Sequence, residues 1–233
     1  IRDSIMEEGL PLATLKTIVD SMASTAKEAG VQIVTGDTKV VEKGHGDGLY
    51  IATTGFGEAH AGVHISGRAA KPGDAVLVTG TMGDHGITIL SHREGLSFGT
   101  DLKSDTAPLN DITESLIAAL GGKVHVLRDP TRGGLATTLN EIASQSAVGI
   151  EMDEEAVPVS PEVQSACEFL GLDPLYIANE GKLIVIVEGV AAEKALEIIR
   201  RSPHGKNASV IGAVTEENPG TVRMKTLLGG QRL

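Results

Sequence analysis

Apolar residues recur along this chain at two spacings, one typical of helices and one typical of strands. Between Pro11 and Gly30 they fall three or four residues apart, which predicts an amphipathic helix. Pro suits the first turn of such a helix, and Gly suits its left-handed cap. Short runs rich in Val, Ile and Leu predict strands. The expected strands are 31–34, 49–54, 75–79, 123–127, 183–187, 209–214 and 221–224, and further helices are expected through Ile87 and over 109–120, 135–146, 161–170 and 191–201.

This order of elements predicts an α/β or α+β layer structure. Residues 55–67 consist largely of Gly, Ala and His with little large apolar content, so we interpret them as the connection between two units. The second unit then opens with a turn, Pro72-Gly73-Asp74, and a strand. The glycine-rich stretch 43–48 lies between two expected strands and is typical of a hairpin turn.

The segment V-T-G-D-T-K, residues 34–39, places a possible Mg-nucleotide site after an apolar run that predicts a buried strand. Gly36 would form a turn at which backbone can approach a ligand closely. Asp37, Thr38 and Lys39 are then expected to leave the strand end together. A carboxylate suits a hard cation, and an ammonium suits a phosphate. A surface turn explains the same residues, and from these residues alone it is the stronger interpretation.

The loop Gly80 to Gly86, G-T-M-G-D-H-G, lies between a strand and a helix. Free amides at a helix N-terminus, together with the freedom of glycine, would make such a loop a cradle for an anion. A tight strand–helix connection explains it equally well. The loop is not of the Walker A type, because the sequence contains no G-x-x-x-x-G-K-[ST].

Residues 128–134, R-D-P-T-R-G-G, also follow a strand and precede a helix. Asp129 and Thr131 are suitable N-cap residues, which is the structural explanation of this segment. The two arginines beside the glycine pair would equally hold a phosphate or a carboxylate in a bidentate manner. Both interpretations remain open.

Residues 178–182, A-N-E-G-K, precede the very apolar strand 183–187. Desolvation at the mouth of a buried strand can make a carboxylate a stronger base, and Glu180 is the carboxylate in question. Turns built from Asn, Glu, Gly and Lys are common, so a solvated turn is the favoured interpretation of this segment alone.

Cys167, the single cysteine, shares one helical face with Val163, Ala166 and Leu170. We expect it to be a small buried hydrophobic residue and not a nucleophile. One cysteine cannot form an internal disulfide, and no signal segment is apparent, so the cytoplasm is the expected compartment.

Composition excludes several classes of function. The formal net charge of −11 argues against a sequence-independent nucleic-acid binder, which needs a cationic face. Aromatic residues make up 2% of the chain and Trp is absent, so platforms for base stacking are not available in number. No apolar run approaches the roughly 20 residues that span a bilayer, so we expect no membrane association.

Four segments of the chain together resemble the motifs of the HypE family of hydrogenase maturation proteins. In order along the chain they are V-T-G-D-T-K, G-T-M-G-D-H-G, D-P-T-R-G-G and Y-I-A-N-E-G-K-L. That family belongs to an ATP-binding superfamily with aminoimidazole ribonucleotide synthetase, selenophosphate synthetase and thiamine-phosphate kinase. The resemblance runs over essentially the whole chain. It implies that residues 1–67 are the second half of an N-terminal α+β domain that binds ATP and forms a dimer, and that residues 68–233 are a C-terminal α/β domain.

The resemblance also implies a reaction. HypE-like proteins use ATP to dehydrate a carboxamide on the thiol of their own C-terminal Cys, and the thiocyanate product supplies a cyanide ligand of [NiFe] hydrogenase. By this resemblance Asp37 would hold Mg²⁺, Lys39 would offset charge near the reacting group, and Glu180 would remove the amide proton. The residues implied to bind the nucleotide are Gly36, Asp37, Thr38, Asp84, His85, Asp129, Thr131, Arg132 and Gly133.

Two parts of the family pattern are not found in this sequence: an N-terminal segment with further Mg- and ATP-binding residues, and a tail that closes with Pro-Arg-Ile-Cys. We therefore expect a fragment that folds at least through its C-terminal domain and does not complete the reaction. The partners implied are a second copy of the chain, the carbamoyltransferase HypF and the HypC–HypD complex. Two alternatives remain: a sister ATP-dependent phosphorylation of selenide or of a small metabolite, and a non-catalytic scaffold for maturation proteins.

Overall fold

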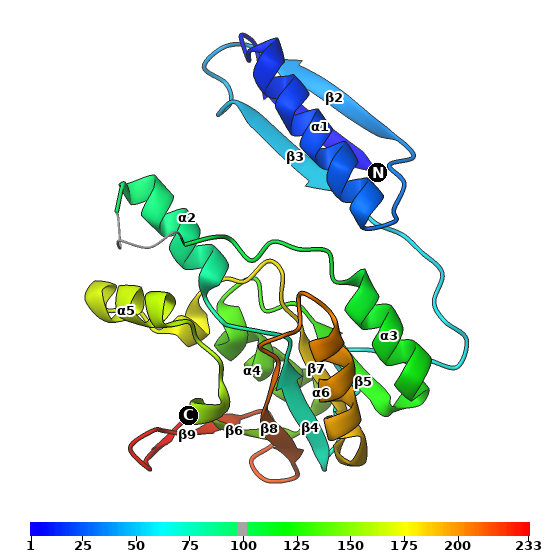
Figure 1. Ribbon diagram of the computed structural model, residues 1–233, viewed down its shortest axis with the longest axis vertical. Coiled ribbons are helices and arrows are strands. Elements are labelled where there is room, and N and C mark those ends of the chain that lie inside the picture. The colour runs from blue at the N-terminus through cyan, green and yellow to red at the C-terminus, as the bar shows by residue number, and fades with distance from the viewer. Residues whose placement is uncertain (97–101) are drawn as a thin grey trace. The chain divides into compact units, whose positions relative to one another are not determined.

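The computed structural model describes residues 1–96 and 102–233, and the chain divides into two compact units, Ile1–His60 and Ala61–Leu233 (Figure 1). Residues 54–73, which include the Gly-, Ala- and His-rich stretch, contain no helix or strand. Along the described residues, no helix has both the length and the apolar character needed to cross a membrane.

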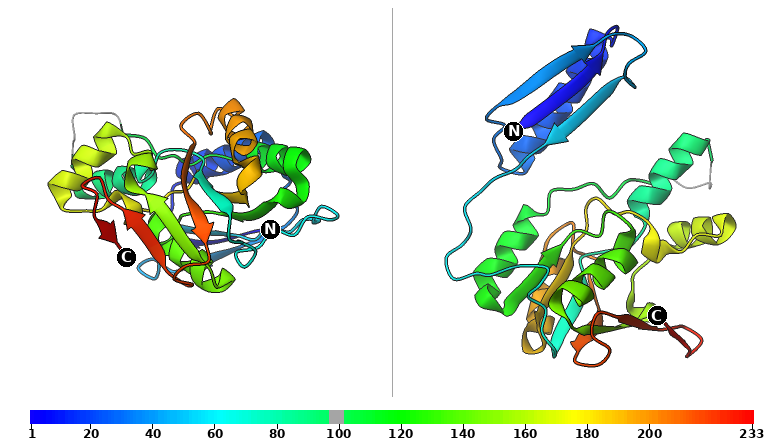
Figure 2. Two further views of the ribbon diagram at one scale, coloured as in Figure 1. Left: turned by 90° about the horizontal axis from the view of Figure 1, so that it is seen from below. Right: turned by 180° about the vertical axis from the view of Figure 1, so that it is seen from behind.

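The first unit is a three-stranded sheet with one helix against it (Figures 1 and 2). The central strand β1 (Arg2–Glu7) pairs parallel with β2 (Gly36–Val41) and antiparallel with β3 (Leu49–Thr53). The helix α1 (Leu12–Glu28) confirms the predicted amphipathic helix. Its half-buried side chains lie on one stripe, formed by Leu15, Ile18, Met22 and Ala26.

The strand expected at 31–34 is wrong. Residues 31–35 form no regular structure, and Val34 is 61% exposed. The strand begins at Gly36 because the backbone there pairs with β1, so closely that a Cβ on Gly36 would lie 1.9 Å from the carbonyl oxygen of Arg2. The hairpin expected at 43–48 is also wrong, since β1 lies between β2 and β3 in the sheet.

The second unit is built on a seven-stranded sheet in the order β10-β9-β6-β8-β4-β7-β5. Neighbouring strands are antiparallel except for the parallel pair β6 and β9. The strands are β4 (Asp74–Val78), β5 (Val124–Arg128), β6 (Gly149–Asp153), β7 (Ile184–Glu188), β8 (Ser209–Thr215), β9 (Val222–Lys225) and β10 (Gln231–Arg232). The helices are α2 (Asp84–Glu94), α3 (Asn110–Leu120), α4 (Gly134–Ser146), α5 (Pro161–Leu170) and α6 (Ala192–Arg201), with short 3₁₀ segments at Gly121–Lys123, Glu154–Ala156, Pro174–Tyr176 and Gly189–Ala191.

Helices cover both faces of this sheet, which is why its central strands read as continuous apolar runs. Leu135, Leu139 and Ile142 of α4 pack with one set of strand side chains. α3 and α6 pack with the alternate set, which includes Leu77 and Val185. The predicted layered structure is thereby confirmed. The strands expected from 49–54 onward and the last four expected helices are present to within one residue at either end. β1, β6 and β10 were not expected.

Cys167 is buried, as predicted, with 1% of its surface exposed. It packs with Ile87 of α2 and with Val163 and Ala166 of its own helix α5. Burial raises the pKa of the Cys167 thiol, and the negative charge of Asp173 raises it further. A thiol in this state is a poor nucleophile.

Candidate active site

The second unit gathers three motif-bearing loops at one edge of its sheet. β7 is antiparallel to both β4 and β5, so the first residue of β7, Ile184, pairs with the last residues of the other two, Val78 and Arg128. The loops that follow β4 and β5 and the turn that precedes β7 therefore lie side by side. They contain the segments G-T-M-G-D-H-G, D-P-T-R-G-G and A-N-E-G-K.

Asn179 fastens these three loops together. It is fully buried, and its side-chain Oδ1 accepts a hydrogen bond of 2.8 Å from the N–H of Gly83. Its Nδ2 donates to the carbonyl oxygens of Pro130 (3.1 Å) and Ile177 (3.0 Å). The backbone N–H of Asn179 also donates to the Pro130 carbonyl, at 3.2 Å. One uncharged side chain thus links the loop after β4, the loop after β5 and the turn before β7.

Two glycines allow the loops to approach one another. A Cβ on Gly86 would lie 2.5 Å from Cγ2 of Ile177, and a Cβ on Gly134 would lie 2.5 Å from the carbonyl oxygen of Leu175. Gly134 also has a φ of +65°, a conformation that side chains with a Cβ rarely adopt. The glycines of two motifs are therefore explained by close packing of the chain against itself.

Three amides of the loop Gly80 to Gly86, those of Met82, Gly83 and Gly86, donate to oxygens of the chain itself. Met82 donates to the carbonyl of Pro158 (2.8 Å), and Gly86 donates to the carbonyl of Ala178 (3.1 Å). The N–H of Gly83 is bound by Asn179. This pattern favours the tight strand–helix connection over the anion cradle, the two interpretations that the sequence left open.

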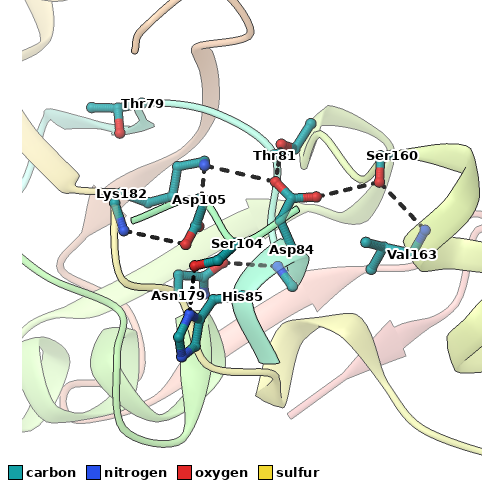
Figure 3. A network of polar contacts seen from close by, with 12 residues as sticks. Thr79, Thr81, Asp84, His85, Ser104, Asp105, Ser160, Val163, Asn179 and Lys182 are labelled. Carbon is teal, nitrogen blue, oxygen red and sulfur yellow. Dashed lines mark hydrogen bonds and ion pairs between the residues drawn. The ribbon is translucent and has the colours of Figure 1, made fainter. Parts of the chain in front are cut away.

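Asp84 and His85 are also engaged within the unit (Figure 3). The Asp84 carboxylate accepts hydrogen bonds from the hydroxyls of Thr81 and Ser160. Nδ1 of His85 lies 2.8 Å from Oγ of Ser104. These contacts give both residues a structural explanation.

A buried ion pair lies beside Asp84. Nζ of Lys182 is 3.1 Å from Oδ2 of Asp105 and 3.7 Å from Oδ2 of Asp84. The side chain of Lys182 is 10% exposed, and that of Asp105 is 3% exposed. A pocket of about 380 Å³ opens next to the pair and is also lined by Thr81 and His204. Sequence reasoning missed both charges, although a Lys directly before a buried strand signals that a buried counter-charge is needed.

Glu180 lies in the turn before β7, and its side chain is exposed. Its backbone N–H donates to Oδ1 of Asp105 at 3.0 Å. Within the part of the chain that the structure describes, the Glu180 carboxylate has no hydrogen-bond or ion-pair partner. This exposed position agrees with the solvated turn that the sequence favoured for this segment.

The explanation of Asp129 and Thr131 as N-cap residues of the next helix is wrong. The N-cap of α4 is Gly133, at a φ of +74°, and no side chain caps the helix. Asp129 instead accepts hydrogen bonds from Thr131 (2.6 Å) and from the guanidinium of Arg128. Partial burial raises the pKa of the Asp129 carboxyl, but these hydrogen bonds and the Arg128 charge outweigh it, so that this pKa lies below its ordinary value. Arg132 is exposed, and it has no hydrogen-bond or ion-pair partner among the described residues.

Asp37, Thr38 and Lys39 do not leave a strand end together, because they lie inside β2. Side chains alternate along a strand, so Asp37 and Lys39 share one face and Thr38 lies on the other. Thr38 pairs with the buried Ser4, which places it on the side of α1. Asp37 pairs with Asp3, and the Asp37 N–H donates to Oδ1 of Asp3 at 3.1 Å.

Asp3 therefore adds a second carboxylate to the open face of the first sheet, and the sequence analysis did not anticipate it. Two carboxylates opposite one another on adjacent strands are suitable ligands for a hard cation. Within residues 1–96 and 102–233, no group of three or more His, Cys, Asp and Glu residues could hold a metal ion.

Family models of known proteins match the chain in two parts that correspond to its two units, Ile1–His60 and Ala61–Leu233. The family model for the N-terminal domain of AIR synthase related proteins matches residues 3–59, and the model for the C-terminal domain matches residues 71–225. The carbamoyl dehydratase HypE of Cupriavidus necator is 58% identical over 229 residues, which cover 98% of this chain and 65% of that protein. This chain belongs to the HypE branch of the AIR synthase related family.

Two solved structures support this membership. A crystal structure of the hydrogenase maturation protein HypE in complex with ATP has a TM-score of 0.96 and 54% identity, and the match covers 100% of this chain and 71% of that one. A crystal structure of a HypE–HypF complex gives a TM-score of 0.96 and 52% identity, covering 100% and 75%. The family and the fold class predicted from the motifs are confirmed. This chain spans 65% of the length of its Cupriavidus necator relative.

We predict that Asn179→Ala destabilises the second unit of this HypE-family chain by about 2–4 kcal/mol, because the N–H of Gly83 would be left buried without a partner and two further hydrogen bonds would be lost. Urea denaturation followed by circular dichroism measures this change. Asn140→Ala is the matched control, since Asn140 is exposed on α4 and its side chain donates to the Ala136 carbonyl. Equal stability of the two variants would contradict the role of Asn179.

We also predict that Thr131→Val raises the pKa of Asp129 toward its ordinary value, because the variant loses the hydroxyl that stabilises the carboxylate. Carbon-13 NMR of the Asp129 carboxyl during an acid titration measures the shift. A lowered pKa in the folded state stabilises the fold above the unfolded-state pKa, and this contribution is lost as the pH falls through the folded-state value. Thr113→Val serves as the control and should leave the pKa of Asp129 unchanged. If the pKa of Asp129 is also unchanged in Thr131→Val, the Thr131 hydroxyl is not what lowers it.

Proposed function

We propose that the protein containing this chain uses ATP to convert a carboxamide on the thiol of its own C-terminal Cys into a thiocyanate. The observation that carries the proposal is the convergence of the HypE motifs on Asn179, which brings Asp129, Thr131 and Glu180 to one edge of the sheet. Its support from relatives is that the Cupriavidus necator protein is named a carbamoyl dehydratase and that a 54% identical HypE was crystallised with ATP.

The reaction is balanced by transfer of the amide oxygen to phosphate. The oxygen of the carboxamide is a poor leaving group, so it first attacks the γ-phosphorus of ATP and displaces ADP. Loss of phosphate, together with the protons on nitrogen, then gives the nitrile. The thioester-like carboxamide and ATP thus become thiocyanate, ADP, hydrogen phosphate and one proton. Such a phosphoryl transfer needs positioning and neutralisation of charge more than covalent assistance from the protein.

In this proposal Glu180 accepts the proton from the amide nitrogen. Its carboxylate is accessible and has no competing partner among the described residues, while its backbone is held by Asp105. Lys39 offsets negative charge near the reacting group, from the open face of β2. Arg132 is an exposed guanidinium suited to a bidentate contact with phosphate.

ATP enters the proposal as a substrate, and the residues offered for it are those whose polar groups remain accessible. These are Asp37, Lys39, Asp129, Thr131, Arg132 and the backbone at Gly133. Gly36 is explained by its close approach to β1, Thr38 lies on the side of α1, and Asp84 and His85 are engaged within the unit, so these four contribute less to the proposal.

Mg²⁺ is the cofactor that the family implies, and the donor chemistry on the first sheet fits it. Asp37 and Asp3 present carboxylate oxygens on adjacent strands, and Mg²⁺ prefers one or two carboxylates together with phosphate oxygens and water. When bound, Mg²⁺ supplies positive charge that neutralises the phosphates.

For partners, we propose a second copy of this chain, HypF and the HypC–HypD complex. HypF has the most direct support, because a 52% identical HypE was crystallised in a complex with it. For location we propose the cytoplasm, because Cys167, the one Cys of this chain, is buried and forms no disulfide that would need an oxidising environment.

Intact mass spectrometry of the complete protein, after incubation with a carbamoyl donor, tests the proposal directly. We expect an adduct that loses one water when Mg-ATP is added and not without it. Glu180→Gln should form the same adduct and bind ATP normally, but its dehydration should be slower by about 10²–10⁴-fold, as is typical when a general base is lost. Glu197→Gln, an exposed substitution on α6, is the control and should dehydrate at the normal rate.

An adduct that never dehydrates would overturn the proposed function and favour a sister phosphorylation. Absence of both adduct and nucleotide binding would favour a scaffold. If Glu180→Gln lost ATP binding as well as dehydration, Glu180 would not be the base.

A further inference from the structure

The Asp105 carboxylate bonds to three consecutive residues of the turn before β7. Figure 3 shows its ion pair with Lys182. Its Oδ1 accepts hydrogen bonds from the backbone N–H groups of Glu180 (3.0 Å) and Gly181 (3.3 Å). Its Oδ2 accepts one from Nζ of Lys182 at 3.1 Å. The carboxylate therefore reaches the turn from a segment more than 70 residues earlier in the chain.

The charge of Asp105 matters because the group is nearly buried, with 3% of its side chain exposed. A buried carboxylate is costly unless it is paired and hydrogen-bonded. Lys182 supplies the opposite charge, and Asp84 lies beyond the same ammonium at 3.7 Å. One cation between two carboxylates thus links the loop after β4, the segment around Asp105 and the turn before β7.

Two glycines in this region lie close to other parts of the chain, Gly181 against backbone and Gly80 against the side chain of Lys182. A Cβ on Gly181 would lie 1.7 Å from the carbonyl oxygen of Asp105, and a Cβ on Gly80 would lie 2.9 Å from Cε of Lys182. Both glycines therefore permit the approach on which the three hydrogen bonds depend. The segment around Asp105 is clamped directly against the turn that carries Glu180.

From this geometry we propose that Asp105 is a positioning residue for Glu180. The Glu180 side chain is exposed and has no partner among the described residues, so the place of its carboxylate depends on its backbone. That backbone is held on one side by the buried Asn179 and on the other by the carboxylate of Asp105. The inference rests on the proposed function, since it concerns the group that removes the amide proton.

The first test measures amide hydrogen exchange by NMR on this chain, and it does not depend on activity. Asp105→Ala should accelerate exchange at Glu180 and Gly181 by about tenfold or more, because each N–H loses a charged acceptor. Asp105→Asn keeps an oxygen acceptor and should accelerate exchange less. Asp111→Ala is the control, since Asp111 accepts a hydrogen bond from Ser202 on another part of the unit. Unchanged exchange at Glu180 and Gly181 in Asp105→Ala would overturn the proposal.

The second test measures single-turnover dehydration of the carbamoyl adduct in the complete protein. Asp105→Ala should lower the rate constant by at least about tenfold and leave the ATP concentration for half-maximal rate unchanged. Asp105→Asn should restore part of the rate, and it also covers the case in which Asp105→Ala fails to fold. The double variant Asp105→Ala/Glu180→Gln should have a dehydration rate constant only slightly lower than that of Glu180→Gln alone, because residues that act as one unit do not contribute independently.

The outcomes separate the two proposals. A normal dehydration rate in Asp105→Ala would overturn the positioning role of Asp105. So would a double variant whose loss of rate equals the product of the two single losses. Neither result would contradict the proposed dehydratase function. Faster amide exchange together with normal dehydration by Glu180→Gln would instead contradict the assignment of Glu180 as the base, and with it the functional part of this inference.

Discussion

The hydrogen bonds of the Asn179 side chain are the constraint on which the candidate site depends. Antiparallel pairing brings the ends of β4 and β5 beside the start of β7, but pairing alone leaves three loops free to move independently. Asn179 closes this arrangement, because an amide offers both an acceptor, used by Gly83, and donors, used by Pro130 and Ile177. A carboxylate in the same place would have to bury a charge, and a hydroxyl could not reach both sides. The three motif-bearing loops, which are distant in sequence, are thus held side by side at one edge of the sheet.

Around this neutral centre, the charged and polar groups divide into two kinds. Asp84, Asp105 and Lys182 are largely buried and satisfy one another, so they hold loops in place. Glu180 and Arg132 are exposed and have no partner in the described parts of the chain, so they are available to a substrate. On the first sheet, Asp37 and Asp3 lie on the open face while Ser4 is buried beneath α1. In the proposed reaction, Glu180 and Arg132 contribute side chains that take no part in holding the loops together.

The sequence predicted most elements of the second unit because their apolar runs are buried by helices on both faces of the sheet. It failed where pairing, and not apolar content, decides the structure. β2 contains G-D-T-K and is a strand because it pairs with β1, whereas the apolar residues before it are exposed. The short strand β6, Gly149–Asp153, was missed although its residues alternate between apolar and charged, because this pattern covers only the four residues from Ile150 to Asp153. Among candidate site residues, Glu180, Asp129 and Thr131 were proposed from motifs, and their roles remain predictions. Asp105 and Asp3 were missed because their partners lie far away in sequence, and no local pattern marks a long-range contact.

Transfer of the carboxamide oxygen to phosphate is the central claim, and oxygen-18 tracing tests it most directly. The complete protein would be loaded with a carbamoyl group labelled with oxygen-18 and then mixed with Mg-ATP, and the inorganic phosphate released would be analysed by mass spectrometry. The account predicts one oxygen-18 atom in each phosphate formed with thiocyanate. Unlabelled phosphate, with the label released to water, would show that the amide oxygen is never phosphorylated and would contradict the account.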